Sequence, residues 1–211
     1  KPRSHLKKTL LTYLKITLFY VIFFSLWRLV FLLVNIPDDG SVTLKDSTPS
    51  FFYGLRMDIS MSCYFLIPTL LLHILFSFFP KRIFSRINFW IHAFLIIVVI
   101  HVVAGNVALY HFWNSMINFR AVSYLVDPTE VFSSLSPGQS VGVIIGMFIL
   151  LTGTILIFRK YFYMQFDAGT SNYFVRFGAL IITIGLTVIG IRGGVQMLPM
   201  NESLVYYSKN N

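Results

Sequence analysis

The residues that could carry chemistry are a few charged side chains at the edges of long apolar stretches. The segment FYGLRMDIS, residues 52–60, places Arg56 and Asp58 at the start of such a stretch. Side chains two residues apart are separated by about 200° around a helix, so Arg56 and Asp58 cannot pair on one face of it. Arg28, inside the preceding apolar stretch, is the expected partner of Asp58, because an unpaired arginine there is costly.

Five charged residues form the candidate site: Arg28, Arg56, Asp58, Arg120 and Arg192. Three of them, Arg56, Arg120 and Arg192, are expected at one membrane level. Guanidinium groups bind phosphate through paired N–H donors, so several at one surface could hold an anionic lipid headgroup. The alternative is structural: one ion pair, with the other arginines reaching to the interface as anchors. The residues alone leave both interpretations open.

Histidines suggest a metal, but their spacing argues against one. His92, His101 and His111 share one apolar stretch, and intervals of nine and ten residues place His92 opposite His101 on a helix. One helix therefore cannot bring all three to a single ion, and no HExxH motif is present. We interpret His92 as an interfacial residue, and His101 and Asn106 as hydrogen-bonding partners between helices.

The sequence contains no recognisable catalytic constellation. We find no nucleophile beside a base, no GxSxG, no phosphate loop and no paired carboxylates. Cys63 is the only cysteine, so the chain has no internal disulfide and no CxxC motif. We predict no catalytic residue, no metal ligand and no cofactor within these 211 residues.

Composition indicates an integral membrane protein. Apolar residues make up 56% of the chain and charged residues 12%, against about 45–50% and 25% in soluble domains. The apolar residues come in blocks of about 20 or more, which match the hydrocarbon thickness of a bilayer. The net charge of +9 is explained by Lys and Arg in the loops between these blocks, so nucleic-acid binding is not predicted.

The blocks predict an all-α, polytopic fold with five transmembrane helices in residues 1–194. The expected spans are about 9–36, 51–79, 87–113, 139–158 and 173–191. Pro37 and Pro80 are expected to stop the first two spans, and Pro68 to kink the second. Gly142 and Gly146 form a GxxxG pair that permits close helix packing. Residues 195–211 are expected to form an extracytoplasmic linker.

Loop charges set the expected orientation. One set of loops holds ten Lys and Arg residues and one acid, and the other set holds five basic and seven acidic residues. The positive-inside rule therefore places the N-terminus in the cytoplasm and, after five crossings, the C-terminus outside. On the outer side, Asp127-Pro128-Thr129-Glu130 has the pattern of a helix start, which predicts short juxtamembrane helices.

Three segments resemble a known family. FFYGLRMDIS, ALYHFWNSMINFRAVSYLVDPTEVFSSL and IRGGVQMLPMNESLVYYS are similar, in order and topology, to the membrane half of the lipoteichoic acid synthase and phosphoglycerol transferase family. These sulfatase-like proteins belong to the alkaline phosphatase superfamily and lie in the bacterial cytoplasmic membrane. The resemblance covers about residues 52–208.

The resemblance implies five spans that anchor an extracytoplasmic catalytic domain. That domain carries a threonine nucleophile and a divalent cation, manganese or magnesium, and transfers glycerol phosphate from phosphatidylglycerol. The chain stops at Asn211, before such a domain, so none of its catalytic residues can be assigned here. The expected partners are the bilayer, an anionic lipid such as phosphatidylglycerol, and the protein's own catalytic domain.

Two other interpretations stay open. The first is the membrane domain of a phosphoethanolamine transferase, which shares five spans and the superfamily of its outer domain. The second is a stand-alone small transporter or scaffold. The lipid donor, the acceptor and the oligomeric state are not specified by the sequence.

Overall fold

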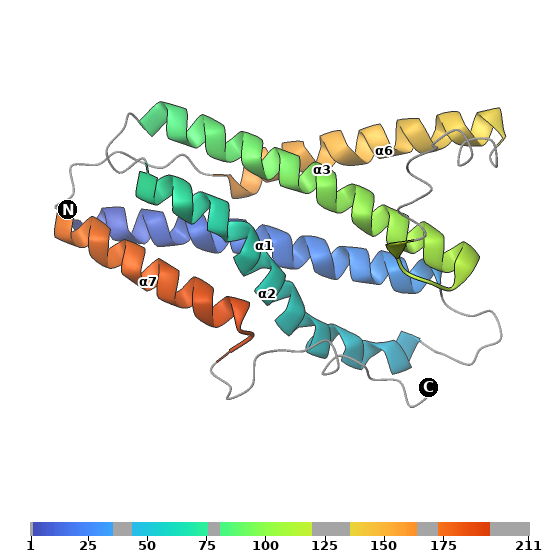
Figure 1. Ribbon diagram of the computed structural model, residues 1–211, viewed down its shortest axis with the longest axis horizontal. Coiled ribbons are helices and arrows are strands. Elements are labelled where there is room, and N and C mark those ends of the chain that lie inside the picture. Colours follow the sequence, from blue (N-terminus) through green and yellow to red (C-terminus); the bar gives the residue numbers. More distant parts are fainter. Residues whose placement is uncertain (1, 36–43, 76–80, 120–135, 164–172, 195–211) are drawn as a thin grey trace.

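The computed structural model describes residues 2–35, 44–75, 81–119, 136–163 and 173–194, which are almost entirely helical. The elements are α1 (Pro2–Val34), α2 (Leu44–Leu75), α3 (Lys81–Trp113), α6 (Pro137–Ile157), the π-helix η3 (Phe158–Phe162) and α7 (Tyr173–Ile191). Successive helices run antiparallel in one elongated bundle (Figure 1). We call the end where α1 begins the proximal end and the end where α1 finishes the distal end.

Among the described residues, four helices are long and apolar enough to cross a membrane. Their apolar segments are Leu10–Val34, Phe51–Leu75, Ile83–His111 and Pro137–Phe162. The described part of α7 has a shorter apolar segment, Phe177–Ile191. An all-helical protein with several such helices is consistent with a multi-pass membrane protein, because a helix satisfies its own backbone groups in lipid.

Three helices begin before the spans predicted from their apolar blocks. Helix α1 starts at Pro2 rather than near residue 9, α2 at Leu44 rather than near residue 51, and α3 at Lys81 rather than near residue 87. The physical reason is that polar and basic residues continue a helix beyond the hydrocarbon layer, where apolarity is no longer required. Helix α2 also passes through Pro68 as one continuous element.

The start of α6 follows from its local sequence. The Ser136 side chain accepts a hydrogen bond from the Gln139 backbone N–H, and the Gln139 side chain accepts one from the Ser136 N–H. Pro137 occupies the first turn, where its missing N–H costs nothing. This capping box satisfies two backbone donors that a helix start otherwise leaves without partners.

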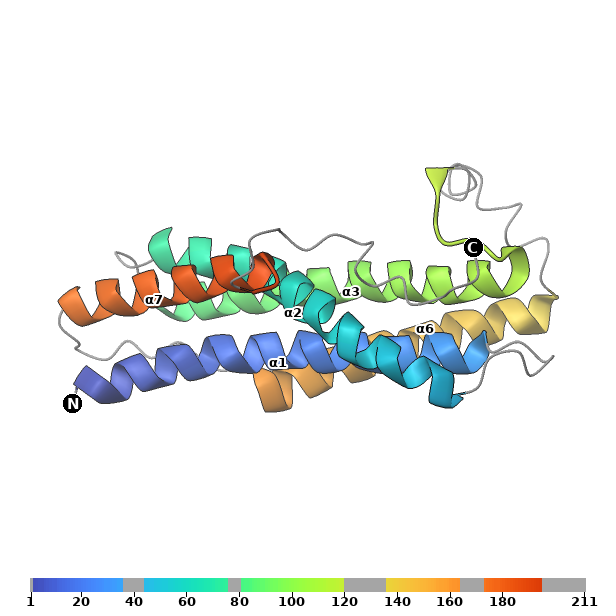
Figure 2. The ribbon, with the colours of Figure 1, turned by 90° about the horizontal axis from the view of Figure 1, so that it is seen from below.

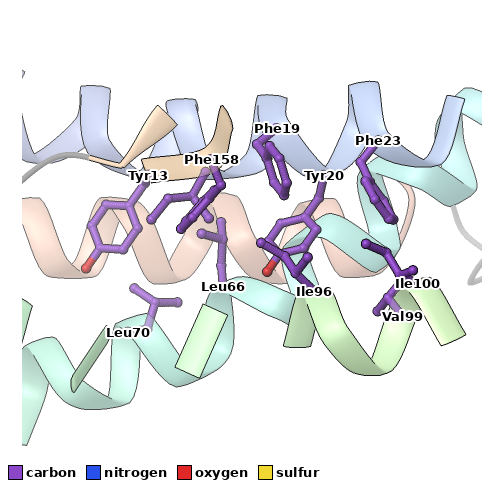
Figure 3. Close-up of a cluster of buried hydrophobic side chains, with 11 residues drawn as sticks. Tyr13, Phe19, Tyr20, Phe23, Leu66, Leu70, Ile96, Val99, Ile100 and Phe158 are labelled. Atoms are coloured by element: carbon purple, nitrogen blue, oxygen red, sulfur yellow. The ribbon is translucent and has the colours of Figure 1, made fainter. Parts of the chain in front are cut away.

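The core lies where α1, α2, α3 and η3 meet (Figure 3). Helix α1 contributes a stripe at helical spacing, and the other elements pack against it. The buried members are Tyr13, Ile16, Phe19, Tyr20, Phe23, Leu66, Leu70, Ile96, Val99, Ile100 and Phe158. In lipid, such contacts stabilise through shape and dispersion rather than through removal from water.

Helix α6 lies at the edge of the bundle, where Met147, Leu151 and Ile155 pack against the core without being fully buried. None of its residues is buried, and a Cβ added to Gly142 or Gly146 would meet nothing within 4 Å. The GxxxG pair therefore packs against no helix in the described part of the chain. At η3 the chain turns into the core, where the Phe158 and Phe19 ring centroids lie 4.8 Å apart.

Tyr163, directly after η3, ties this end of α6 to α3. Its hydroxyl donates a hydrogen bond to the backbone carbonyl of Ser85. Burial raises the pKa of Tyr163, so the hydroxyl keeps its proton and remains a donor at physiological pH. The contact holds η3 beside the first turns of α3.

Helices α2 and α7 pack closely at Gly190. A Cβ at that position would overlap the Sγ of Cys63 on α2. A glycine facing a small side chain lets two membrane helices pack closely. The packing of α7 therefore depends on the absence of a side chain at residue 190.

We expect Gly190→Ala to destabilise the folded protein by about 1–3 kcal/mol, because the added methyl group overpacks the α2–α7 contact. Thermal unfolding in detergent, followed by circular dichroism, measures the loss. Gly178→Ala is the matched control, since a Cβ there meets nothing within 4 Å. Cys63→Ala should rescue part of the loss, and equal melting temperatures for the two glycine variants would contradict this packing.

Candidate functional site

Two opposite faces of α2 carry the polar residues near its distal end. Gly54 and Asp58 lie four residues apart on the face toward α1, and Arg56 and Ser60 have the same spacing on the face toward α7. Helical geometry separates the two pairs by about 160–200°. Helix α2 therefore contacts α1 with one polar face and α7 with the other.

The ion pair expected between Arg28 and Asp58 is present. Nη2 of Arg28 lies 2.7 Å from Oδ1 of Asp58, and Ser25 donates to Oδ2 at 3.3 Å. Only 6% of the Asp58 side chain is exposed. A carboxylate so placed needs both a counter-charge and hydrogen bonds, and α1 supplies both.

Gly54 makes room for this pair. A Cβ at residue 54 would overlap Cζ, Nη1 and Nη2 of Arg28, so the guanidinium lies flat against the α2 backbone. Nη1 of Arg28 is buried there and has no hydrogen-bond partner. One polar atom is thus left unsatisfied in exchange for the close approach of α1 to α2.

On its other face, α2 caps the end of α7. Arg56 Nη2 donates to the Gly193 carbonyl at 2.8 Å, and Ser60 Oγ donates to the Ile191 carbonyl at 2.6 Å. The last carbonyls of a helix have no partner within it. We call these two bonds the α7 clamp.

The end of α7 has a backbone geometry that requires glycine. Gly193 has φ 77° and Gly194 φ 127°. The Gly194 N–H donates to the Ile189 carbonyl at 3.0 Å and the Gly193 N–H to the Gly190 carbonyl at 2.9 Å. This is a Schellman motif with glycine in the left-handed position. It turns the chain sharply at the point where the α7 clamp holds it.

The five candidate residues do not form one cluster in the described part of the chain. Arg28 and Asp58 pair on the α1 side, whereas Arg56 faces α7. Arg192 is exposed within the turn that ends α7. Arg120 and the expected helix start at residues 127–130 lie outside the described residues. Arg28 and Arg56 are therefore not placed to grip one phosphate together.

A buried polar network that sequence reasoning missed joins three helices near the proximal end. The Tyr20 hydroxyl lies 2.9 Å from Nδ1 of His92, Thr69 Oγ1 lies 2.7 Å from Nε2 of His92, and Thr69 donates to Asn88 Oδ1 at 2.8 Å. Because Thr69 has one proton and gives it to Asn88, Nε2–H of His92 must donate to Thr69. In the neutral imidazole with this tautomer, Nδ1 accepts a hydrogen bond from the Tyr20 hydroxyl.

The structure corrects the interpretations of His92, His101 and Asn106. His92 is fully buried and is not interfacial. His101 is exposed and bonds the Ile97 carbonyl of its own helix, while Asn106 accepts from the Ile117 N–H just after that helix. Neither therefore bonds another helix. The overlooked signal was that Asn88 and His92 precede Ile96 at four-residue intervals, in line with the apolar stripe.

Within the described residues, no group of three or more His, Cys, Asp or Glu side chains could hold a metal ion. The Arg28–Asp58 pair, the α7 clamp and the contacts of His92 instead connect helices.

We expect Asp58→Asn to destabilise the protein by about 3 kcal/mol, because it leaves the Arg28 guanidinium without a counter-charge between two helices. The double variant Arg28→Met/Asp58→Leu should lose less than that, since it removes both charges. Unfolding of Arg28→Met, Asp58→Leu and the double variant by SDS in mixed micelles gives the free energies for a double-mutant cycle. Strictly additive losses would show that the two residues do not interact.

We expect His92→Leu to cost about 1–2 kcal/mol, because Tyr20 and Thr69 lose their shared partner. His101→Leu, on the same helix, should change stability by less than about 0.5 kcal/mol, because it removes an exposed bond within one turn. The same SDS unfolding assay compares the two variants. Equal losses would contradict the assignment of His92 to the core network.

No family model, curated protein or solved structure matches the chain.

Proposed function

We propose that this chain is the membrane domain of a bacterial phosphotransferase that acts on phospholipid headgroups, similar to lipoteichoic acid synthases and phosphoglycerol transferases. One observation carries the proposal. FFYGLRMDIS on α2 and IRGG at the end of α7 bear the resemblance and lie 131–137 residues apart, yet they are joined by the α7 clamp. Because the two segments contact each other, there is a physical reason why both should resemble the same family.

The proposal includes α7 as a fifth span. Its 19 residues measure about 28 Å at 1.5 Å per residue, close to the hydrocarbon thickness of about 30 Å. With five antiparallel crossings and the loop charges of the sequence, the N-terminus lies in the cytoplasm and the end of α7 outside. Short juxtamembrane helices on the outer side and a linker at 195–211 complete this plan.

The α7 clamp suits the anchoring of an outer domain. A domain that takes lipid headgroups must be held at a defined height and direction above the bilayer. The clamp fixes where the chain leaves α7, and the Arg28–Asp58 pair fixes α2, which carries the clamp. The resemblance assigns the threonine nucleophile and the manganese or magnesium ion to that outer domain.

The geometry also narrows the proposed headgroup role. Arg56 uses Nη2 for Gly193, and a guanidinium has five N–H donors, so others remain for a phosphate. Arg192 belongs to the same turn, whereas Arg28 is committed to Asp58 on the opposite face. We therefore assign headgroup contact to Arg56 and Arg192 and a structural role to Arg28.

The proposal predicts that the protein in its native membrane is much larger than the 24.3 kDa of this chain. Intact mass and peptide mapping after extraction test this. C-terminal peptides from a metal-binding, hydrolase-like domain would support the proposal. A mass near 24 kDa would refute it and leave the transporter and scaffold interpretations.

We expect Arg56→Gln to lower headgroup transfer by the whole enzyme about tenfold, because it removes a phosphate donor and loosens the clamp. Ser60→Ala is the matched control, since it weakens the same clamp without removing a charge. Transfer from phosphatidylglycerol and from phosphatidylethanolamine should both be assayed, because they separate the two enzyme classes. If Arg56→Gln leaves lipid binding and activity unchanged, Arg56 has only a structural role.

A further inference from the structure

Four basic residues lie on η3 or on the turns of α1 and α3 next to it: Lys15 of α1, Arg86 of α3, and Arg159 and Lys160 of η3 itself. The Arg159 guanidinium carbon lies 6.0 Å from the centroid of the Phe89 ring. This contact places η3 beside the turn of α3 that carries Arg86. Arg86 lies three residues before Phe89 and about 60° from it around the helix. Lys15 lies on α1 one turn before Phe19, which packs against η3.

These cations have no anionic partner in the described part of the chain. The carboxylate whose side chain is described there, Asp58, is taken by Arg28 near the other end of α2. Arg86 and Lys160 are exposed, as is Arg159. The patch is therefore a concentration of positive charge that these residues do not neutralise.

The cations of η3 lie at the end of an apolar segment, Pro137–Phe162, rather than in a loop beyond it. Phe158 packs against Phe19, nine residues along the apolar stretch that begins at Leu10, or about 13 Å along the helix axis. Figures 1 and 2 show that the orange end of α6 stops well short of the proximal end of α1. Cations within an apolar segment are costly unless their long side chains reach a phosphate.

The π-helix explains why two consecutive cations face outward. A π turn holds one residue more than an α turn, which re-aims side chains, often at functional sites. Phe158 points into the core, while Arg159, Lys160 and Tyr161 remain exposed. The same segment thus buries one aromatic ring and presents two charges to the lipid side.

Exposed aromatic side chains border the charges. Trp90, four residues after Arg86 on α3, is 66% exposed and Tyr161 is 57% exposed. The Lys160 Nζ lies 5.1 Å from the Tyr161 ring centroid. Trp and Tyr favour the headgroup level of a bilayer, and Phe94, one turn beyond Trp90, continues the apolar surface toward the acyl chains.

We propose that the η3 patch, formed by Lys15, Arg86, Arg159, Lys160, Trp90 and Tyr161, binds the headgroup phosphate of an anionic phospholipid in the leaflet at the proximal end. The four cations meet the phosphate, and the exposed rings meet the glycerol and upper acyl region. A lipid fits better than a free anion because the charged and apolar parts are adjacent. This site is separate from Arg56 and does not rest on the proposed enzyme.

Native mass spectrometry of the 211-residue chain in detergent tests the proposal. The probes are phosphatidylglycerol and phosphatidylcholine with identical acyl chains, together with inorganic phosphate. We expect phosphatidylglycerol to bind at least tenfold more tightly than phosphatidylcholine. Arg159→Gln/Lys160→Gln should weaken phosphatidylglycerol binding about fivefold for each charge removed, without lowering the melting temperature. Arg159→Lys/Lys160→Arg should retain the preference.

The control removes a charge outside the patch and outside the α7 clamp. Lys7→Gln, at an exposed position in the first turns of α1, should leave the preference for phosphatidylglycerol over phosphatidylcholine intact. The proposal is overturned if the two lipids bind equally, if the double Gln variant keeps the preference, or if inorganic phosphate competes at equal concentration. It is also overturned if the preference appears only after Asp167→Asn, which would mean that this carboxylate occupies the patch.

Discussion

The Arg28–Asp58 ion pair is the interaction on which the distal half of the bundle depends. It places opposite charges between two helices, where neither charge could remain alone without a large loss of stability. It also explains Gly54, since any side chain there would displace the guanidinium. Because the pair fixes the rotation of α2 about its axis, it decides which residues α2 turns toward α7.

That rotation links the ion pair to the α7 clamp. Once Asp58 faces α1, Arg56 and Ser60 face the opposite side, where the carbonyls that end α7 lie. The end of α7 is therefore held by α2, and α2 is held by α1. Helices α1, α2 and α7 are thus joined by the glycine turn that ends α7 and by five polar side chains, those of Ser25, Arg28, Arg56, Asp58 and Ser60.

Polar contacts also organise the proximal half, where lipid gives helices little hydrophobic reason to associate. His92 connects Tyr20 and Thr69, and its ring lies 5.4 Å from that of Phe158, centroid to centroid. This arrangement places η3 in the core while its two cations stay outside. The Phe158 ring thus connects η3 to the buried histidine, while Arg159 and Lys160 of the same segment stay exposed.

Some of this architecture could be predicted from the sequence. Charges are so few in the apolar stretches that Arg28 and Asp58 had almost no other partners, and Ser136 with Gln139 is a local capping pattern. The role of His92 could not be predicted, because a polar residue on a membrane helix is buried or exposed according to how neighbouring helices pack. For the same reason the sequence placed Arg28 and Arg56 in one candidate site. In the structure the rotation of α2 turns Arg56 toward α7 and away from Arg28.

The extent of α6 was predicted closely, as about 139–158 against the observed Pro137–Ile157, but its place at the edge of the bundle could not be predicted from the sequence. Its glycine pair permits close packing, but the described helices leave that face open. The π-helix at its end depends on the fit of Phe158 into the core and has no sequence signature of its own.

The central claim is that Arg56 and Ser60, on an α2 oriented by the Arg28–Asp58 pair, fix the end of α7. Electron–electron double resonance tests it most directly, with spin labels at the exposed positions Leu55 and Ile189 in a Cys63→Ala background. The account predicts a narrow distance distribution that broadens in Arg56→Gln/Ser60→Ala and again in Asp58→Asn. A distribution of unchanged width in both variants would contradict it, because helix packing alone would then hold α7 in place.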